Sequence, residues 1–210
     1  MSFGYIGDTS TSVKQQVKNK GILTTQESFD LERQGFLGGS LELINTVSFS
    51  SVTSTIDFTN IQEDVFNVHL VQLTAILNGS GGSFYVRTSQ DNGSSFDATT
   101  GDYQHATQRM WGDGNFYESN STNGSAMEIY GQSGNGDQPT NRFIYIYNAG
   151  NSSSYTFITT QSSNWDNKLK ATFGGGIRDN AHTVNAIRFF TNVGGGFESA
   201  TAKIYGVKQI

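Results

Sequence analysis

Apolar and polar residues alternate with a period of two along most of the chain from Leu41 onward. Successive side chains of a β-strand point to opposite faces, so this alternation predicts strands. Near the C-terminal end, Ala200, Ala202 and Ile204 alternate with polar residues, which is typical of a half-buried antiparallel strand. The stretch from Thr183 to Val207 therefore predicts two strands across a glycine turn, and these strands close a β-sheet.

The same alternation predicts about ten strands, separated by turns rich in Gly, Asn, Asp and Ser. The turn at 91–93 contains Asn-Gly, which favours the left-handed positions of a type I′ turn. Residues 111–137 show the least regular pattern, and a long loop is expected there. Many strands with regular turn signals predict an all-β fold, an antiparallel β-sandwich of the jelly-roll-like kind. The predicted strands lie at 41–58 with an interruption near Ser50, and at 65–77, 84–88, 103–110, 126–130, 142–147, 155–160, 168–173, 184–190 and 199–207.

The segment from Val65 to Leu77 is the longest predicted strand, and it is apolar on both faces. In a two-layer sandwich the protein's own second sheet covers one face of such a strand. Phe66, Val68 and Leu70 are therefore expected either to meet a neighbouring copy of the chain or to be covered by another part of the same chain.

Residues 1–45 lack the period-two pattern and are expected to form an N-terminal docking arm, while residues 46–210 form the sandwich domain. Thr24 stands three residues before Glu27, which is the spacing of a capping box, and predicts a short helix from Thr25 to Gln34. A helix of this length is marginal alone, so it needs a docking surface. The expected docking contacts are the separated apolar residues of the arm, namely Phe3, Tyr5, Ile6 and Phe29.

Composition narrows the class of protein further. Aromatic residues make up 12% of the 210 residues and there is a single proline, which argues against a disordered chain. The net charge of −5 argues against nucleic acid as the main partner. The absence of cysteine excludes disulfides and thiolate metal sites. The first residues resemble neither a signal peptide nor a membrane span, so we expect synthesis in a cytoplasm and no membrane insertion.

Few residues suggest catalysis. The histidines His69, His105 and His182 are isolated from one another, and no nucleophile elbow, phosphate-binding loop or zinc-binding helix is present, so no cofactor or metal is expected. A glycosidase needs two nearby carboxylates, and a group of five lies between residues 91 and 118. Aspartates beside Gly, Asn or Ser more often initiate turns, so we favour that role. The five carboxylates are Asp91, Asp97, Asp102, Asp113 and Glu118.

Calcium binding at 91–93 or 113–115 is chemically possible, although the terminal glutamate of the full loop pattern is missing. The tryptophans Trp111 and Trp165 both stand beside flexible polar residues. Exposed aromatic rings stack on sugars, so both tryptophans are candidate carbohydrate contacts. The alternative is that each ring seals the edge of the core, and we favour that packing role.

Several motifs together resemble small virion structural proteins of marine tailed phages, including cyanophages. The motifs are Phe3-Gly-Tyr-Ile-Gly-Asp8, Gly21-Ile-Leu-Thr-Thr-Gln-Glu-Ser-Phe-Asp-Leu31, Gly38-Gly-Ser-Leu-Glu-Leu-Ile44, and the ending Val184-Asn-Ala-Ile-Arg-Phe to Ile204-Tyr-Gly-Val207. The resemblance implies a virion component with a β-sandwich head, deployed as a tail-fibre-like appendage or a capsid decoration, usually as a homotrimer. It implies no particular functional residue.

The leading expectation is a non-enzymatic virion structural protein whose arm docks on other tail or capsid proteins and whose sandwich points outward, where host-surface attachment is a natural role. The alternatives are a capsid decoration protein, a carbohydrate-binding module acting through Trp111 and Trp165 on a host-surface glycan, and, with least support, a glycan hydrolase using the loop carboxylates.

Overall fold

The structure is a computed structural model that describes residues 25–26, 40–79, 82–129, 138–165, 167–192 and 194–208. Thr25 and Gln26 are helical, at the start of the predicted helix. The rest of that helix and the docking residues Phe3, Tyr5, Ile6 and Phe29 lie outside the described residues. Within the described part of the chain, no helix is long and apolar enough to cross a membrane.

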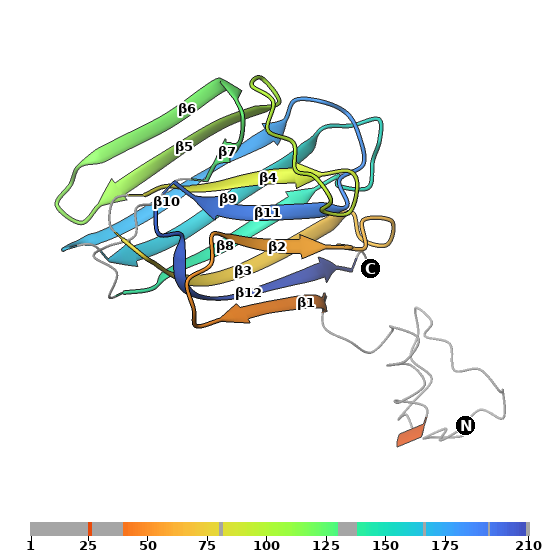
Figure 1. Cartoon of the computed structure of the whole chain (residues 1–210), viewed down its shortest axis with the longest axis horizontal. Coiled ribbons are helices and arrows are strands. Elements are labelled where there is room, and N and C mark those ends of the chain that lie inside the picture. Colours follow the sequence, from red (N-terminus) through yellow and green to blue (C-terminus); the bar gives the residue numbers. More distant parts are fainter. Residues whose placement is uncertain are drawn as a thin grey trace, which may run out of the picture. The chain divides into compact units, whose positions relative to one another are not determined.

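The described residues from Leu41 onward form twelve antiparallel strands in two sheets, in a β-sandwich-like arrangement (Figure 1). The fold class predicted from the alternation is thus confirmed at the level of an all-β, two-sheet protein. The larger sheet contains, in spatial order, β1 (Leu41–Phe49), β12 (Phe197–Val207), β3 (Val68–Leu77), β8 (Thr140–Tyr147), β9 (Thr156–Trp165), β10 (Leu169–Arg178), β5 (Tyr103–Trp111) and β6 (Phe116–Gly124). The smaller sheet contains β2 (Thr55–Thr59), β11 (Ala186–Thr191), β4 (Phe84–Ser89) and β7 (Met127–Glu128).

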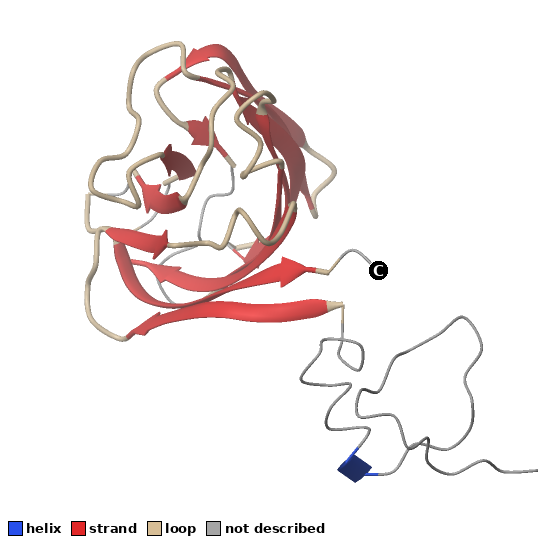
Figure 2. Ribbon diagram, turned by 90° about the vertical axis from the view of Figure 1, so that its right-hand side faces the viewer, coloured by secondary structure: helices blue, strands red, loops and turns tan. Residues whose placement is uncertain are grey.

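The apolar core fills the space between the two sheets. Figure 2 shows the large sheet curving around the small one. The small sheet contributes large side chains such as Phe58, Phe84 and Phe189, which are completely buried. They face aliphatic residues of β3, β8 and β12, because the alternate positions of those strands point inward. The Phe58 and Phe189 rings lie 6.3 Å apart between centroids, in an edge-to-face arrangement.

The C-terminal strand behaves as its alternation predicts. Ala200, Ala202 and Ile204 are buried, and the alternating residues of β12 are partly or fully exposed. The two strands on either side of the preceding glycine turn were expected to lie in one sheet. In the structure, β11 lies in the small sheet and β12 in the large one. The reason is local: Gly196 adopts a φ of +70°, and Phe197 then exchanges two backbone hydrogen bonds with Thr53. At this turn the chain therefore passes from the small sheet to the large sheet instead of folding back within one sheet.

The prediction of a long loop at 111–137 is wrong for Phe116–Gly124, because these residues form strand β6. A tight turn returns the chain onto β5: the Trp111 amide donates to the Asn115 carbonyl at 2.9 Å, and Gly114 has a φ of +89°. β6 is the edge strand of the large sheet and none of its residues is buried. A strand without a buried face has no reason to show apolar alternation, so the sequence pattern gave no signal.

The turn after β4 has the predicted backbone conformation. Asn92 and Gly93 both have positive φ values, 57° and 85°, as a type I′ turn requires. The turn does not make a hairpin, however, because β4 pairs with β11 and β7. The first strand, β1, begins at Leu41 and so starts inside the range assigned to the docking arm.

Candidate functional site

The solvent-facing side of the large sheet is the most distinctive surface of the described protein. We call the outer face the side of β3, β8, β9, β10 and β5 that points away from the small sheet. β9 alternates between buried and exposed residues over its whole length, and β8 does so over nearly all of its length. The exposed set includes large aromatic rings: Phe143 on β8 is 49% exposed and Phe173 on β10 is 45% exposed.

A row of side chains crosses the outer face perpendicular to the strands. Strand register places Gln72 opposite Phe143, Phe143 opposite Gln161, Gln161 opposite Phe173, and Phe173 opposite Gln108. The row therefore alternates between amide and aromatic side chains over five adjacent strands. Neighbouring strands are about 4.8 Å apart, so the two phenylalanines stand about 10 Å apart with one glutamine between them.

Further aromatic side chains flank this row. Tyr145 and Tyr147 have nearly parallel rings at 6.3 Å between centroids. Trp165 and Leu169 are in register at the end of the β9–β10 pair, and each is 54% exposed. Sequence reasoning singled out Trp165 but not Phe143, Phe157, Phe173 or Gln161, because a period of two does not tell which face of a strand is covered.

The inner side of the same strands carries buried cations. Arg142, Lys170 and Arg109 point inward from β8, β10 and β5 and are all almost fully buried. The Arg142 guanidinium lies 4.1 Å from the Phe84 ring centroid, and its Nη1 donates to the Ile129 carbonyl at 2.9 Å. Burial lowers the pKa of Arg142 to about 9, so it stays charged at neutral pH. These strands therefore bury charge and expose aromatic rings.

The two tryptophans lie on opposite faces of the large sheet. Trp111 points inward, with its ring 4.6 Å from Tyr117 and with the charged groups of Lys170 and Arg109 at 4.5 Å and 5.1 Å from the indole centroid. Trp165 instead stands on the outer face. The pair therefore cannot form one sugar-binding platform, and carbohydrate contact by either ring stays a prediction.

The predicted interface residues of the long strand are mostly covered within the single chain. Phe66 is 6% exposed, and its ring occupies the space beside Gly206, where an added Cβ would lie 2.3 Å from ring atoms. Leu70 is 4% exposed and stands on β3 in register with Tyr145 on one side and Tyr205 on the other. Val68 is half-buried. These three side chains leave little apolar surface for a neighbouring copy.

Asp91 organises its own turn. It accepts hydrogen bonds from the Ser89 hydroxyl at 2.7 Å, from the Ser95 hydroxyl at 2.6 Å and from the Ser95 amide at 2.9 Å. The Ser89 hydrogen bond, followed by those from Ser95, lowers the pKa of Asp91 to about 2. This is the turn-initiating role that competes with catalysis.

Three of the other four carboxylates also have structural partners. Asp97 forms an ion pair with the buried Arg178, whose Nη1 also donates to the Thr88 hydroxyl at 2.8 Å. Asp102 lies 3.9 Å from the same guanidinium. Asp113 pairs with Lys168, and that hydrogen bond is the main cause of its lowered pKa. Glu118 is exposed on β6, in register with Gln108.

The histidines are separate from one another. His69 is buried, its Nε2 lies 2.9 Å from the Ile61 carbonyl oxygen, and burial lowers its pKa. His105 Nε2 lies 3.8 Å from a Glu128 carboxylate oxygen, and burial lowers its pKa as well. In the residues that the structure describes, no three His, Cys, Asp or Glu side chains gather closely enough to hold a metal ion.

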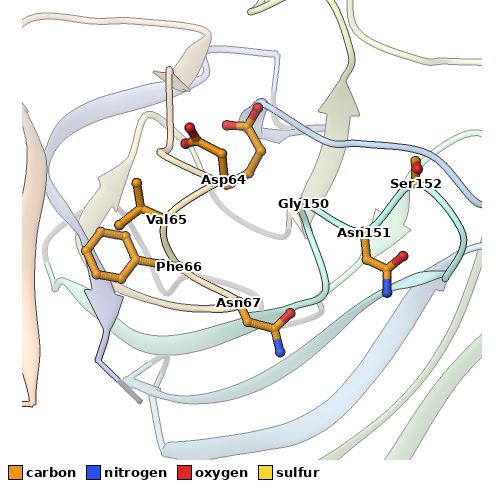
Figure 3. Close-up of a pocket in the computed structure, with 8 residues that line it drawn as sticks. Asp64, Val65, Phe66, Asn67, Gly150, Asn151 and Ser152 are labelled. Atoms are coloured by element: carbon orange, nitrogen blue, oxygen red, sulfur yellow. The ribbon is translucent and has the colours of Figure 1, made fainter. Parts of the chain in front are cut away.

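A pocket of about 400 Å³ lies between residues 63–67 and 150–152. Figure 3 shows Asp64, Val65, Phe66 and Asn67 on one side of it and Gly150, Asn151 and Ser152 on the other. The two segments touch at the backbone, because a Cβ added to Gly150 would lie 2.1 Å from the Glu63 carbonyl oxygen. Its lining offers carboxylates, amides and a hydroxyl but no nucleophile and base in contact, so its geometry indicates no reaction.

Comparison with known proteins gives no relative on which to base an assignment: no protein-family model, curated protein or solved structure matches the chain.

Proposed function

We propose that this chain is a non-enzymatic structural protein of a phage particle, which displays the β-sandwich at the particle surface and makes contact through the outer face of the large sheet. The observation that carries the proposal is the set of exposed aromatic rings on that face, with Phe143 and Phe173 at its centre. Soluble proteins seldom leave such rings grouped on one surface unless the surface has a partner.

The non-enzymatic part of the proposal is supported by the roles of the loop carboxylates. Asp91, Asp97 and Asp113 stabilise a turn, a buried arginine and a lysine, respectively. A glycosidase would instead need two carboxyl groups facing each other across a substrate site.

The virion context comes from the resemblance of the sequence motifs. A tail-fibre-like appendage and a capsid decoration protein are both consistent with a sandwich that presents one sheet face outward, and host attachment is the role that favours the first. The same proposal includes docking through residues 1–45, a jelly-roll-like connectivity and a homotrimer. Light scattering of the purified chain tests whether it forms a trimer.

Immunogold electron microscopy tests the particle assignment. Antibodies against the purified chain should label the surface of tailed phage particles whose genome encodes it, and particles without gold would contradict the assignment. The contact face is tested separately by adding the purified chain to host cells before the phage. The wild-type chain should reduce phage adsorption, and a Phe143→Ala/Phe173→Ala variant should not. Equal competition by both chains would remove the outer face from the proposal.

A further inference from the structure

The outer face carries no charge over its central strands. Across the described strands β3, β8, β9, β10 and β5, none of the outward positions holds a charged residue. Arginine and lysine in β8, β10 and β5 point inward instead, as Arg142 and Lys170 do. Charged residues on this side begin only on the flanking strands, with Lys203 on β12 and Glu118 on β6. A protein surface of this size usually has many charges, so a neutral partner is indicated.

The second feature is the order of side chains within the row. Phe143 and Phe173 are separated by Gln161 and bordered by Gln72 and Gln108. Each amide offers both donors and an acceptor, and each exposed ring offers an apolar face. The row thus repeats the same two kinds of contact, apolar and hydrogen-bonding, from strand to strand across the sheet.

This order distinguishes between two kinds of occupant. The centre of a protein–protein interface is a contiguous apolar patch, in which aromatic rings pack with aliphatic side chains. In the row, each ring instead has amides as cross-strand neighbours. Tyr145 is the next outward residue after Phe143 on β8, but the outward residues on either side of Gln161 on β9 are the polar Thr159 and Ser163. A chain of neutral sugar units matches this better, since each unit has apolar C–H groups on a face and hydroxyl groups around its edge.

We infer that the outer face binds a neutral, extended polysaccharide that runs across the strands along the row from Gln72 to Gln108. The inference rests on the proposed use of the outer face for contact and names its ligand class. The rings of Phe143 and Phe173 stack on sugar faces, and Gln161 exchanges hydrogen bonds with hydroxyl groups between them. The net charge of −5 disfavours acidic polysaccharides through repulsion.

Affinity electrophoresis of the purified full-length chain tests the inference. Native gels are cast with xyloglucan, galactomannan, mixed-linkage β-glucan, dextran or glycogen, and with alginate or polygalacturonate as acidic probes. At least one neutral polysaccharide should retard the chain, and Phe143→Ala/Phe173→Ala should weaken the interaction about tenfold or more, as expected for the loss of two ring contacts. The matched control is Tyr85→Ala/Phe190→Ala, which removes a stacked aromatic pair of the small sheet and should leave retardation unchanged.

A third variant guards against misfolding. Gln161→Leu keeps the shape of an exposed strand residue but removes the amide, and it should also reduce retardation. Three outcomes would overturn the inference. They are no retardation by any neutral polysaccharide, retardation by the acidic probes alone, and equal retardation of wild type and Phe143→Ala/Phe173→Ala. Self-association that is lost in the Phe variant, without retardation, would assign the face to a second copy. If gold labels the particles but no polysaccharide retards the chain, the virion assignment stands and only the polysaccharide ligand is ruled out. If a neutral polysaccharide retards the chain but gold does not label the particles, the ligand stands and the virion assignment is ruled out.

Discussion

Phe143 and Phe173 share one cross-strand partner, because Gln161 on β9 is in register with both. The two rings therefore stand on either side of the same amide, two strand spacings apart. Rings held on two strands of one hydrogen-bonded sheet keep a fixed separation, which is the geometry needed to recognise a repeating ligand.

The first prediction is that this row contributes little to stability. Both rings are about half exposed, so Phe143→Ala and Phe173→Ala should each lower the free energy of unfolding by no more than about 1 kcal/mol, the range of strand propensities. The matched core variant Phe189→Ala should cost about 3–5 kcal/mol. Urea unfolding followed by circular dichroism measures both. A large loss at Phe143 would mean that its ring packs within the chain, and the case for a ligand contact would fail.

The two tryptophans should differ in the same measurement. Trp111 packs against Tyr117 and beside the buried Lys170, so Trp111→Ala should lower the free energy of unfolding by about 3 kcal/mol. Trp165 is 54% exposed, and Trp165→Ala should change the free energy of unfolding by about 0.5 kcal/mol or less. Equal losses would show that the inward and outward assignment of the two rings is wrong.

Gly206 on β12 is expected to tolerate no side chain. A methyl group there would meet three atoms of the Phe66 ring at 2.3–2.5 Å, and that ring is buried. Gly206→Ala should therefore destabilise the protein by about 1–3 kcal/mol through overpacking. Gly194→Ala is the matched control, because nothing lies within 4 Å of its added Cβ. Thermal unfolding compares the two, and similar melting temperatures would contradict the placement of Phe66.

The hydrogen bonds of Asp91 predict a contribution to acid sensitivity. The carboxylate is stabilised in the folded protein, where hydrogen bonds from Ser89 and Ser95 lower its pKa from the usual 3.8 to about 2. The unfolded chain then binds the proton more readily, so this contribution is present above about pH 4 and is lost as the pH falls toward 2. Asp91→Asn should therefore flatten the pH dependence of unfolding between about pH 4 and 2. Identical pH profiles for wild type and Asp91→Asn would refute the role of the turn.

Strand positions could be predicted where one face of the strand is buried. β12 shows this clearly, since Ala200, Ala202 and Ile204 lie in the core. β6 could not be found, because an edge strand with no buried residue needs no apolar alternation. The separation of β11 and β12 into different sheets could not be found either, because a glycine turn does not specify which sheet receives the next strand.

The candidate site could not be predicted either, because the sequence pattern does not specify which face of a strand points outward. Arg142 and Phe143 are adjacent, and general preferences would place the phenylalanine inside and the arginine outside. The structure reverses them, because Phe84 and the Ile129 carbonyl provide partners for a buried guanidinium. The outer face therefore follows from contacts between strands far apart in the sequence, and the row through Gln161 exists only once the register of β8, β9 and β10 is known.

The most direct test of the outer face as the contact surface is hydroxyl-radical footprinting of the purified chain with and without host-cell envelope fragments. Mass spectrometry reports the oxidation of individual aromatic residues. Oxidation of Phe143, Tyr145 and Phe173 should fall when the fragments are present, while Tyr85 and Phe190 on the small sheet are oxidised as before. Protection of Tyr85 and Phe190 instead, or unchanged oxidation of all five residues, would contradict the assignment of the outer face as the contact surface.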